Sequence, residues 1–373
     1  MADQDVHPHT FAGDRRLGDY MIKPWVFEFM HALDRPADQL GPDDITDMFD
    51  DSMKLWERIE EQGFEGIFFR EHHFGHAYSP SPNLLIAAIA QRTSRMRLGT
   101  MGMVLPFYAP WRIAEEIAML DHLTNGRLEI GCANGVPQEL ERVGMEPEEA
   151  RERFNEALDI VDAALAEPVI SYHGKYWNFD DLNILPRPRQ QPSPPKWTTI
   201  VSKGSAKKSA GRGSKICTGF QSIGLITEIF DVYRDEGDRL DVPVGPDDIG
   251  LRRNVSVDRD EAAAHEAAKV AAELGRKLLA GDSRVGQENS PLLDAPTAGS
   301  GFSVHEDEFI SGTPTQVAEQ VIEQCRASGA GHFLAILGRG AGSRRAEFVE
   351  LFGEEVVPEL RRAEVAKTLA STA

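Results

Sequence analysis

Short apolar runs alternate with longer amphipathic stretches along most of the chain. Most of the short runs are apolar on both faces, which is typical of parallel strands covered by helices. The runs that we expect to be strands are Trp25–Phe29, Gly66–Phe69, Arg97–Leu105, Arg127–Cys132, Trp197–Val201, Lys215–Thr218, Ile249–Val257 and His332–Leu337.

Helical patterns fill the intervals between these strands. The stretch Asp43–Gln62, for example, opens with acidic residues and ends before Gly63, as helix caps require. A strand followed by a helix, repeated eight times, predicts a (β/α)₈ TIM barrel. A doubly wound sheet is the alternative, but no G-x-G-x-x-G follows any of the strands. The other predicted helices are Asn83–Thr93, Trp111–Leu123, Glu148–Ala166, Ser205–Arg212, Leu225–Arg239, Asp260–Leu279, Thr315–Ser328 and Arg345–Arg361.

The predicted organisation is one barrel over residues 21–365, between a polar arm at 1–20 and a tail at 366–373. Two insertions interrupt the barrel. Residues 168–196 carry a hairpin pattern and then a Pro-rich stretch. Residues 281–312 are rich in Gly, Ser and acidic residues, and a segment of that length within a domain is expected to be a mobile lid.

Charge and cysteine content narrow the class of protein. The formal net charge of −20 disfavours nucleic acid and anionic membranes as partners. The three cysteines are too few and too scattered for a disulfide framework, and no C-x-x-C pair suggests structural zinc. The start of the chain is polar and no run is long enough to span a membrane, so we expect a cytoplasmic protein.

The sharpest chemical signal is the segment Glu71-His72-His73-Phe74-Gly75-His76, directly after a predicted strand. The carboxyl ends of barrel strands form the active-site face. The histidines and the carboxylate there suit proton transfer near neutral pH. A metal site built from His72, His73 and His76 is a second interpretation, and a loop whose histidines only pack is a third.

Three weaker signals follow other predicted strands. The run Gly99–Pro106 carries a glycine near its end, where a ligand or another backbone approaches closely. Cys132 is a free thiol at a strand end, although an inert buried cysteine is more common. The segment 202–205 (Ser-Lys-Gly-Ser) opens a helix and would cradle a phosphate or serve as an ordinary N-cap.

Taken in order, these motifs resemble the bacterial luciferase-like flavin monooxygenases. The resemblance is carried by EHHF, by the run from Pro82 to Gly135, by R-x-R-F at residues 151–154, by PxPPKW and by the SKGSA segment. It is strong from about residue 21 to 240 and weaker beyond.

The resemblance implies an FMNH₂-dependent monooxygenase on the same barrel, an oxidoreductase that incorporates one oxygen atom. Reduced FMN would come from a separate NAD(P)H-dependent flavin reductase, and O₂ would react as a flavin C4a-hydroperoxide. The substrate would be a small apolar organic molecule, such as an aldehyde, ketone, terpene or alkane-like compound.

The resemblance also assigns residues. His72 matches the catalytic histidine, with Glu71 and His73 beside it. Met101-Gly102 matches a cis peptide that lies against the flavin ring, and Cys132 matches a cysteine beside it. The phosphate-binding turn falls at Ser202, Gly204 and Ser205. Ala133 replaces an arginine that helps to hold phosphate in the luciferases, and Asn134 beside it is assigned to the cofactor site. The phosphate charge would then be met elsewhere, by Lys203, or FMN would bind weakly.

Other functions remain open at this point. The same barrel in an F420-dependent oxidoreductase would transfer hydride without oxygen, whereas the three histidines would serve a metal-dependent hydrolase. A non-catalytic flavin-binding relative is a further possibility. The helix at Asn83–Ala90 is apolar on nearly every face, which predicts a homodimer or a tetramer built from dimers.

Overall fold

A computed structural model describes residues 17–30, 39–74, 78–279, 304–338, 344–363 and 365–367. In this part of the chain, eight parallel strands form a closed ring in the order β2, β3, β4, β6, β9, β10, β11, β13 and back to β2. The predicted barrel is therefore confirmed, and the open doubly wound sheet is excluded. The ring strands are β2 (Lys23–Glu28), β3 (Gly66–Phe69), β4 (Arg97–Thr100), β6 (Leu128–Ala133), β9 (Lys196–Thr199), β10 (Lys215–Thr218), β11 (Ile249–Val257) and β13 (His332–Leu337).

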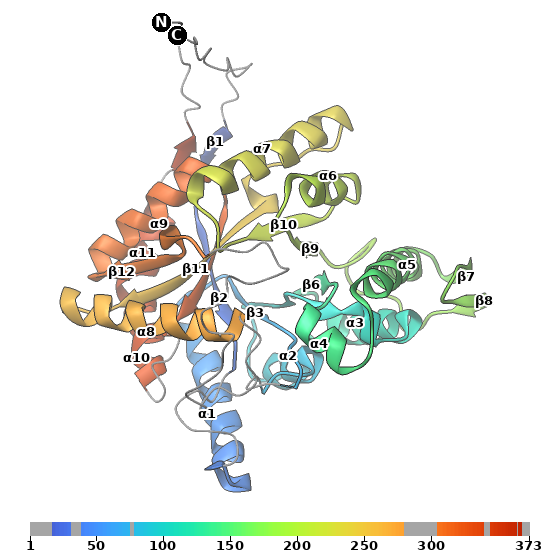
Figure 1. Ribbon diagram of the computed structural model, residues 1–373, viewed down its shortest axis with the longest axis horizontal. Helices are drawn as coiled ribbons and strands as arrows, with labels where there is room; N and C mark the ends of the chain where they lie inside the picture. Colours follow the sequence, from blue (N-terminus) through green and yellow to red (C-terminus); the bar gives the residue numbers. More distant parts are fainter. Residues whose placement is uncertain are drawn as a thin grey trace, which may run out of the picture.

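Helices surround the ring of strands (Figure 1). Several of them begin at a proline, which lacks the N–H that a helix start leaves unpaired and already has a helical φ. The helices are α1 (Pro42–Glu61), α2 (Pro82–Ala90), α3 (Pro110–Leu123), α4 (Pro137–Arg142), α5 (Pro147–Ala166), α6 (Lys203–Gly211), α7 (Ile223–Arg239), α8 (Glu261–Leu279), α9 (Pro314–Ser328), α10 (Arg345–Leu351) and α11 (Val357–Arg362), with a π-helical turn at Phe352–Val356 between the last two.

A small apolar cluster fills the inside of the ring and is separate from the larger core between strands and helices. Its members alternate along the strands, as side chains on one face of a sheet must. Trp25 stacks on Phe68 with ring centroids 4.5 Å apart. The cluster consists of Trp25, Phe27, Phe68, Met101, Trp197, Cys217, Leu334 and Ile336.

A buried histidine closes the amino-terminal end of this interior. Trp25 Nε1 donates a hydrogen bond to His332 Nδ1 at 2.8 Å, so His332 Nε2 carries the proton and donates to the Asp247 carbonyl at 3.0 Å. Burial lowers the pKa of His332 to about 3. This histidine is therefore neutral and serves the structure.

The strand predicted over Arg97–Leu105 is wrong as a single element. Strand β4 ends just before a cis peptide between Met101 and Gly102. The chain then forms the short β5 (Met103–Val104) and turns into a 3₁₀ helix at Leu105–Phe107. Among the described strands, β5 pairs with β6 alone. Close packing explains the glycine at this position, because a Cβ on Gly102 would lie 2.7 Å from the Cys132 carbonyl carbon.

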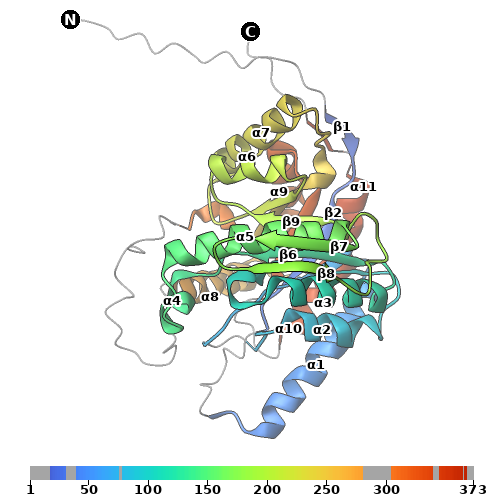
Figure 2. The same cartoon turned by 90° about the vertical axis from the view of Figure 1, so that its right-hand side faces the viewer.

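Outside the ring, the hairpin expected after residue 168 is present as antiparallel β7 (Val169–His173) and β8 (Asn178–Asn183) (Figure 2). Of the expected lid at 281–312, residues 281–303 lie outside the described residues. Its last residues form a 3₁₀ turn at Glu306–Glu308 and β12 (Phe309–Gly312), which pairs with β11.

The two ends of the described chain also form a pair of strands, at the boundaries of the predicted arm and tail. β1 (Leu17–Tyr20) runs antiparallel to β14 (Val365–Lys367). Among the described residues, no helix is long and apolar enough to cross a membrane.

Candidate active site

The segment Glu71–Phe74 leaves the carboxyl end of β3, on the face where barrel enzymes carry their chemistry. Phe68 on β3 belongs to the interior cluster, and the guanidinium of Arg70, just after the strand, lies 3.6 Å above the ring of Phe29, which packs against that cluster. His72 follows two residues later, so it lies just beyond the carboxyl end of β3.

A carboxylate from helix α4 holds His72. Glu139 Oε1 lies 2.7 Å from His72 Nδ1 and also accepts the backbone N–H of His73 at 3.1 Å. Because a carboxylate only accepts hydrogen bonds, Nδ1 carries the proton. The lone pair of Nε2 is then left for chemistry.

His72 is neutral at physiological pH. Burial, followed by the positive charge of Arg70, lowers the pKa of His72 to about 4, although the hydrogen bond and the charge of Glu139 act in the opposite direction. A neutral imidazole with Nδ1 engaged can accept a proton at Nε2.

Glu71 and His73 form a second pair with a different character. His73 Nε2 lies 2.8 Å from Glu71 Oε1, and this hydrogen bond raises the pKa of His73. The fully buried Glu71 carboxylate also accepts the Val104 N–H at 3.2 Å and a hydrogen bond from the Tyr108 hydroxyl. The pair thus ties the β3 loop to the segment after β4.

No group of three or more His, Cys, Asp and Glu in the described part of the chain is arranged to hold a metal ion. His76, the third histidine of the metal interpretation, lies outside the described residues. His72 and His73 are each engaged by a different carboxylate.

Cys132 lies at the end of β6, buried beside β5. Burial raises the pKa of its thiol to about 12, so the thiol stays protonated near neutral pH. Reactive cysteines are thiolates. The surroundings of Cys132 therefore favour contact and packing over nucleophilic chemistry.

The segment 202–205 opens α6, and both sequence interpretations apply to it. The Ser202 hydroxyl accepts the Ser205 N–H at 3.2 Å as a helix cap and lies 3.0 Å from the Ser205 hydroxyl. Lys203 pairs with the exposed Glu228 at 2.8 Å. A Cβ on Gly204 would meet nothing nearer than 3.9 Å, so the helix start is open to a ligand.

Fit to a flavin phosphate can be judged from these residues. The first-turn N–H groups of α6 lack intrahelical acceptors and, with the hydroxyls of Ser202 and Ser205, suit a phosphate. Asn134, just after the adjacent end of β6, has a buried Oδ1 without a hydrogen-bond partner among the described residues; as an acceptor it suits a flavin hydroxyl or N–H rather than the phosphate oxygens. The residues fit the group, with Lys203 as the cation at this turn.

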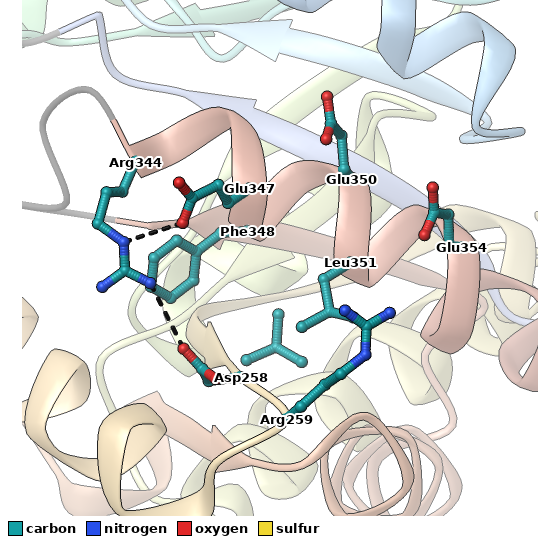
Figure 3. Close-up of a pocket in the computed structure, with 9 residues that line it drawn as sticks. Asp258, Arg259, Arg344, Glu347, Phe348, Glu350, Leu351 and Glu354 are labelled. Atoms are coloured by element: carbon teal, nitrogen blue, oxygen red, sulfur yellow. Dashed lines mark hydrogen bonds and ion pairs between the residues drawn. The ribbon is translucent and has the colours of Figure 1, made fainter.

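A hollow of about 390 Å³ lies elsewhere, between the end of β11 and α10 (Figure 3). Its wall carries Asp258 and Glu347, both within ion-pair distance of Arg344 at 3.5 and 2.9 Å. None of its lining residues comes from the ends of β3, β4 or β6. This hollow is therefore separate from the His72 site.

Comparison with known proteins identifies the family. The model of the luciferase-like monooxygenases matches residues 29–332, and the chain belongs to this family. The uncharacterised protein y4wF of Sinorhizobium fredii is 37% identical over 211 residues, which cover 56% of this chain and 61% of that protein. The oxygenase component of a flavin-dependent trigonelline monooxygenase from Acinetobacter baylyi is 32% identical over 192 residues, which cover 50% and 52%.

The chain thus spans little more than half the length of these two relatives. An F420-dependent glucose-6-phosphate dehydrogenase of Kineococcus radiotolerans aligns over more of its length, at 28% identity over 342 residues, 87% of this chain and 95% of that protein. The monooxygenase RslO1 of Streptomyces bottropensis has the same fold, with a TM-score of 0.77 and 24% identity over 90% of this chain and 99% of that one. The family therefore includes both flavin and F420 enzymes.

Sequence reasoning missed Glu139. No helix was expected at Pro137–Arg142, yet α4 carries the carboxylate to His72. The local signal was a proline followed two residues later by an acid, a common helix start. Only the fold places that helix beside the end of β3.

Proposed function

We propose that this protein is an FMNH₂-dependent monooxygenase that incorporates one atom of O₂ into a small organic substrate. The observation that carries the proposal is the neutral His72, with Nδ1 bound to Glu139 and no hydrogen bond from Nε2 to any residue that the structure describes. Family membership supports the oxidoreductase class, and the relative named as an oxygenase component supports a separate flavin reductase as partner.

The proposed flavin site joins two parts of the carboxyl face. Ser202, Gly204 and Ser205 would hold the phosphate at the start of α6, with Asn134 nearby. The isoalloxazine ring would lie against Met101-Gly102, beside Cys132. Reduced FMN supplies two electrons for the activation of O₂.

The chain's own residues would manage protons and water. His72 Nε2 would accept a proton from the reacting centre and return it, while Glu139 keeps the imidazole in the required tautomer. Glu71 and His73 would fix the loop that carries His72. The apolar floor formed by Phe27 and Phe29 would exclude water beneath the substrate.

We further propose that two copies of the chain associate through α2 and α3. Leu84 on α2 and Met119 and Leu123 on α3 expose 71%, 52% and 45% of their surface, and the two helices pack against each other. An apolar face of this kind is typical of an interface.

The test supplies FMN, NADH and a flavin reductase to the purified protein with a panel of aldehydes, ketones and terpenes. We expect O₂ consumption and a product heavier by one oxygen atom. His72→Ala should lower turnover about 10²- to 10⁴-fold, the range of general acid–base catalysis, with FMN affinity unchanged. A His72→Ala variant that keeps wild-type turnover would contradict the assignment.

F420-dependent hydride transfer is the second candidate, because the F420-dependent relative aligns over most of both chains. The same purified protein is therefore assayed with reduced F420 under nitrogen. Turnover with F420 and none with FMNH₂ would replace the first proposal by the second.

A further inference from the structure

A second arginine occupies the interior of the barrel, on the far side from His72. Arg252 stands on β11 in register with Leu334 of the interior cluster, and only 6% of its side chain is exposed. Its guanidinium lies 3.9 Å above the Phe220 ring and 5.8 Å from the Phe27 ring. A Cβ on Gly219 would come within 2.5 Å of Arg252 Nη2, so the glycine makes room for the guanidinium.

Most of the hydrogen-bonding capacity of this group is unused. Arg252 Nη2 donates to Glu308 Oε1 at 2.8 Å, and no other hydrogen bond from its guanidinium is made to the described residues. Asn254, the next interior residue of β11, donates from Nδ2 to the same oxygen at 2.7 Å. The buried Oδ1 of Asn254 has no hydrogen-bond partner among the residues that the structure describes. The remaining N–H donors of Arg252 and the Oδ1 acceptor of Asn254 therefore lie on the same face of β11 without hydrogen-bond partners among the described residues.

The buried positive charges around Glu308 also outnumber the buried negative ones. Arg253 contacts Glu308 Oε2 at 3.3 Å, so two buried guanidinium groups share one buried carboxylate. Asp307 acts on Arg253 but is 27% exposed, so water screens its charge. A buried excess of positive charge is costly unless a ligand supplies an anion.

The order of the strands places this group relative to the proposed flavin. In the ring, four steps separate β11 from β4 in either direction, so the two strands are opposite each other. The proposed ring site at Met101-Gly102 follows β4, and the proposed phosphate site begins α6. Arg252 therefore faces the flavin across the mouth of the barrel, where a substrate has to lie.

We propose that Arg252 and Asn254 bind the substrate through a carboxylate or similar oxyanion, which the guanidinium holds with its free N–H groups. Asn254 Oδ1 accepts a hydrogen bond from an N–H or O–H next to that group. The inference rests on the proposed function and refines it. The substrate has an apolar body over Phe27 and Phe29 and an anionic end at β11.

The test compares acids with their uncharged amides, because the substrate is not identified. Acetate, benzoate and decanoate, and the matching amides, are titrated by calorimetry into protein saturated with FMN. In the wild type we expect at least one acid to bind about tenfold or more tightly than its amide. Arg252→Met should abolish that preference, whereas Arg252→Lys should retain part of it.

Two controls separate the possible failures. Arg252→Met leaves Glu308 paired with Arg253 at 3.3 Å, and Arg252→Gln, which keeps a donor for Glu308 without the charge, keeps the test valid if Arg252→Met does not fold. FMN affinity, measured by fluorescence, should change less than about twofold in all variants. FMN binding and peroxide formation from FMNH₂ test the proposed function independently of any acid.

Three outcomes would overturn the inference. The first is a wild type that prefers none of the acids over their amides. The second is an acid preference that survives in the folded arginine variants. The third is a loss of FMN affinity on removal of Arg252, which would assign the arginine to the flavin.

Discussion

Replacement of Glu139 by Gln tests whether the carboxylate positions His72 or merely packs against it. The substitution keeps the shape of the side chain and removes its charge. It weakens the 2.7 Å contact with His72 Nδ1, a hydrogen bond to a charged group. Such bonds contribute about 1.5–3 kcal/mol. If that free energy is expressed in the transition state, kcat falls about 10- to 150-fold.

The tautomer adds to the effect. A glutamine amide can donate to Nδ1, which would then leave the proton on Nε2, on the side of the reacting centre. A histidine in that tautomer cannot accept a proton at Nε2. We therefore expect the loss in kcat without a loss of FMN affinity.

The pH profile separates positioning from damage. Neutral His72 is the working form, so activity should fall as the pH decreases through its pKa of about 4. Glu139 raises that pKa, and its replacement should therefore move the acid limb to lower pH while the plateau drops. A variant whose structure is only disturbed would have a lower activity plateau and the same acid limb as the wild type.

The assay measures product formation with FMNH₂ at each pH, with only brief exposure of the protein to that pH. Glu141→Gln, an exposed residue on the same helix, is the matched control and should behave as the wild type. Our reasoning fails if Glu139→Gln keeps kcat within twofold and has the wild-type acid limb.

Three other predictions follow from the same structure. Between pH 6.5 and 4.5, His332 is protonated in the unfolded chain but stays neutral in the folded protein. The free energy of unfolding should therefore fall by up to about 1.4 kcal/mol for each pH unit of acidification. His332→Gln should reduce this loss in urea unfolding, and an equal loss in both proteins would contradict the assignment. Leu84→Glu with Met119→Glu should convert a dimer to a monomer in light scattering, and a monomeric wild type at micromolar concentration would disprove the interface. Ser202→Ala should weaken FMN binding about tenfold and leave riboflavin binding unchanged, whereas an equal loss for both would remove Ser202 from the phosphate site.

The pattern of apolar runs was sufficient to predict the barrel. Each ring strand lies between two layers, so its sequence is apolar on both faces and stands out from the amphipathic helices. The pattern could not show the break after β4. The need for glycine at position 102 is equally invisible in the sequence, because it comes from the backbone of β6, a different strand that lies against it.

The candidate site was predictable only in part. Glu71, His72 and His73 are adjacent in the sequence, and the end of a strand is a general location for chemistry in this fold. Glu139 on α4 and Glu308 in the 3₁₀ turn before β12 are distant in sequence from the residues that they contact, and no local pattern predicts those contacts. The opposite roles of His72 and His73 likewise depend on burial and on partners rather than on residue type.

The pairing of β1 with β14 has a practical consequence. Only Met21 and Ile22 separate β1 from the start of β2, so the clasp of the two chain ends lies on the amino-terminal face of the barrel. A tether, a fused reductase or an immobilising tag joined directly at Leu17 or Lys367 would leave from this face, opposite the strand ends that carry His72. The pairing of Leu17 with Lys367 also suits circular permutation of residues 17–367, with these two positions joined by a short linker and new ends opened in a surface loop.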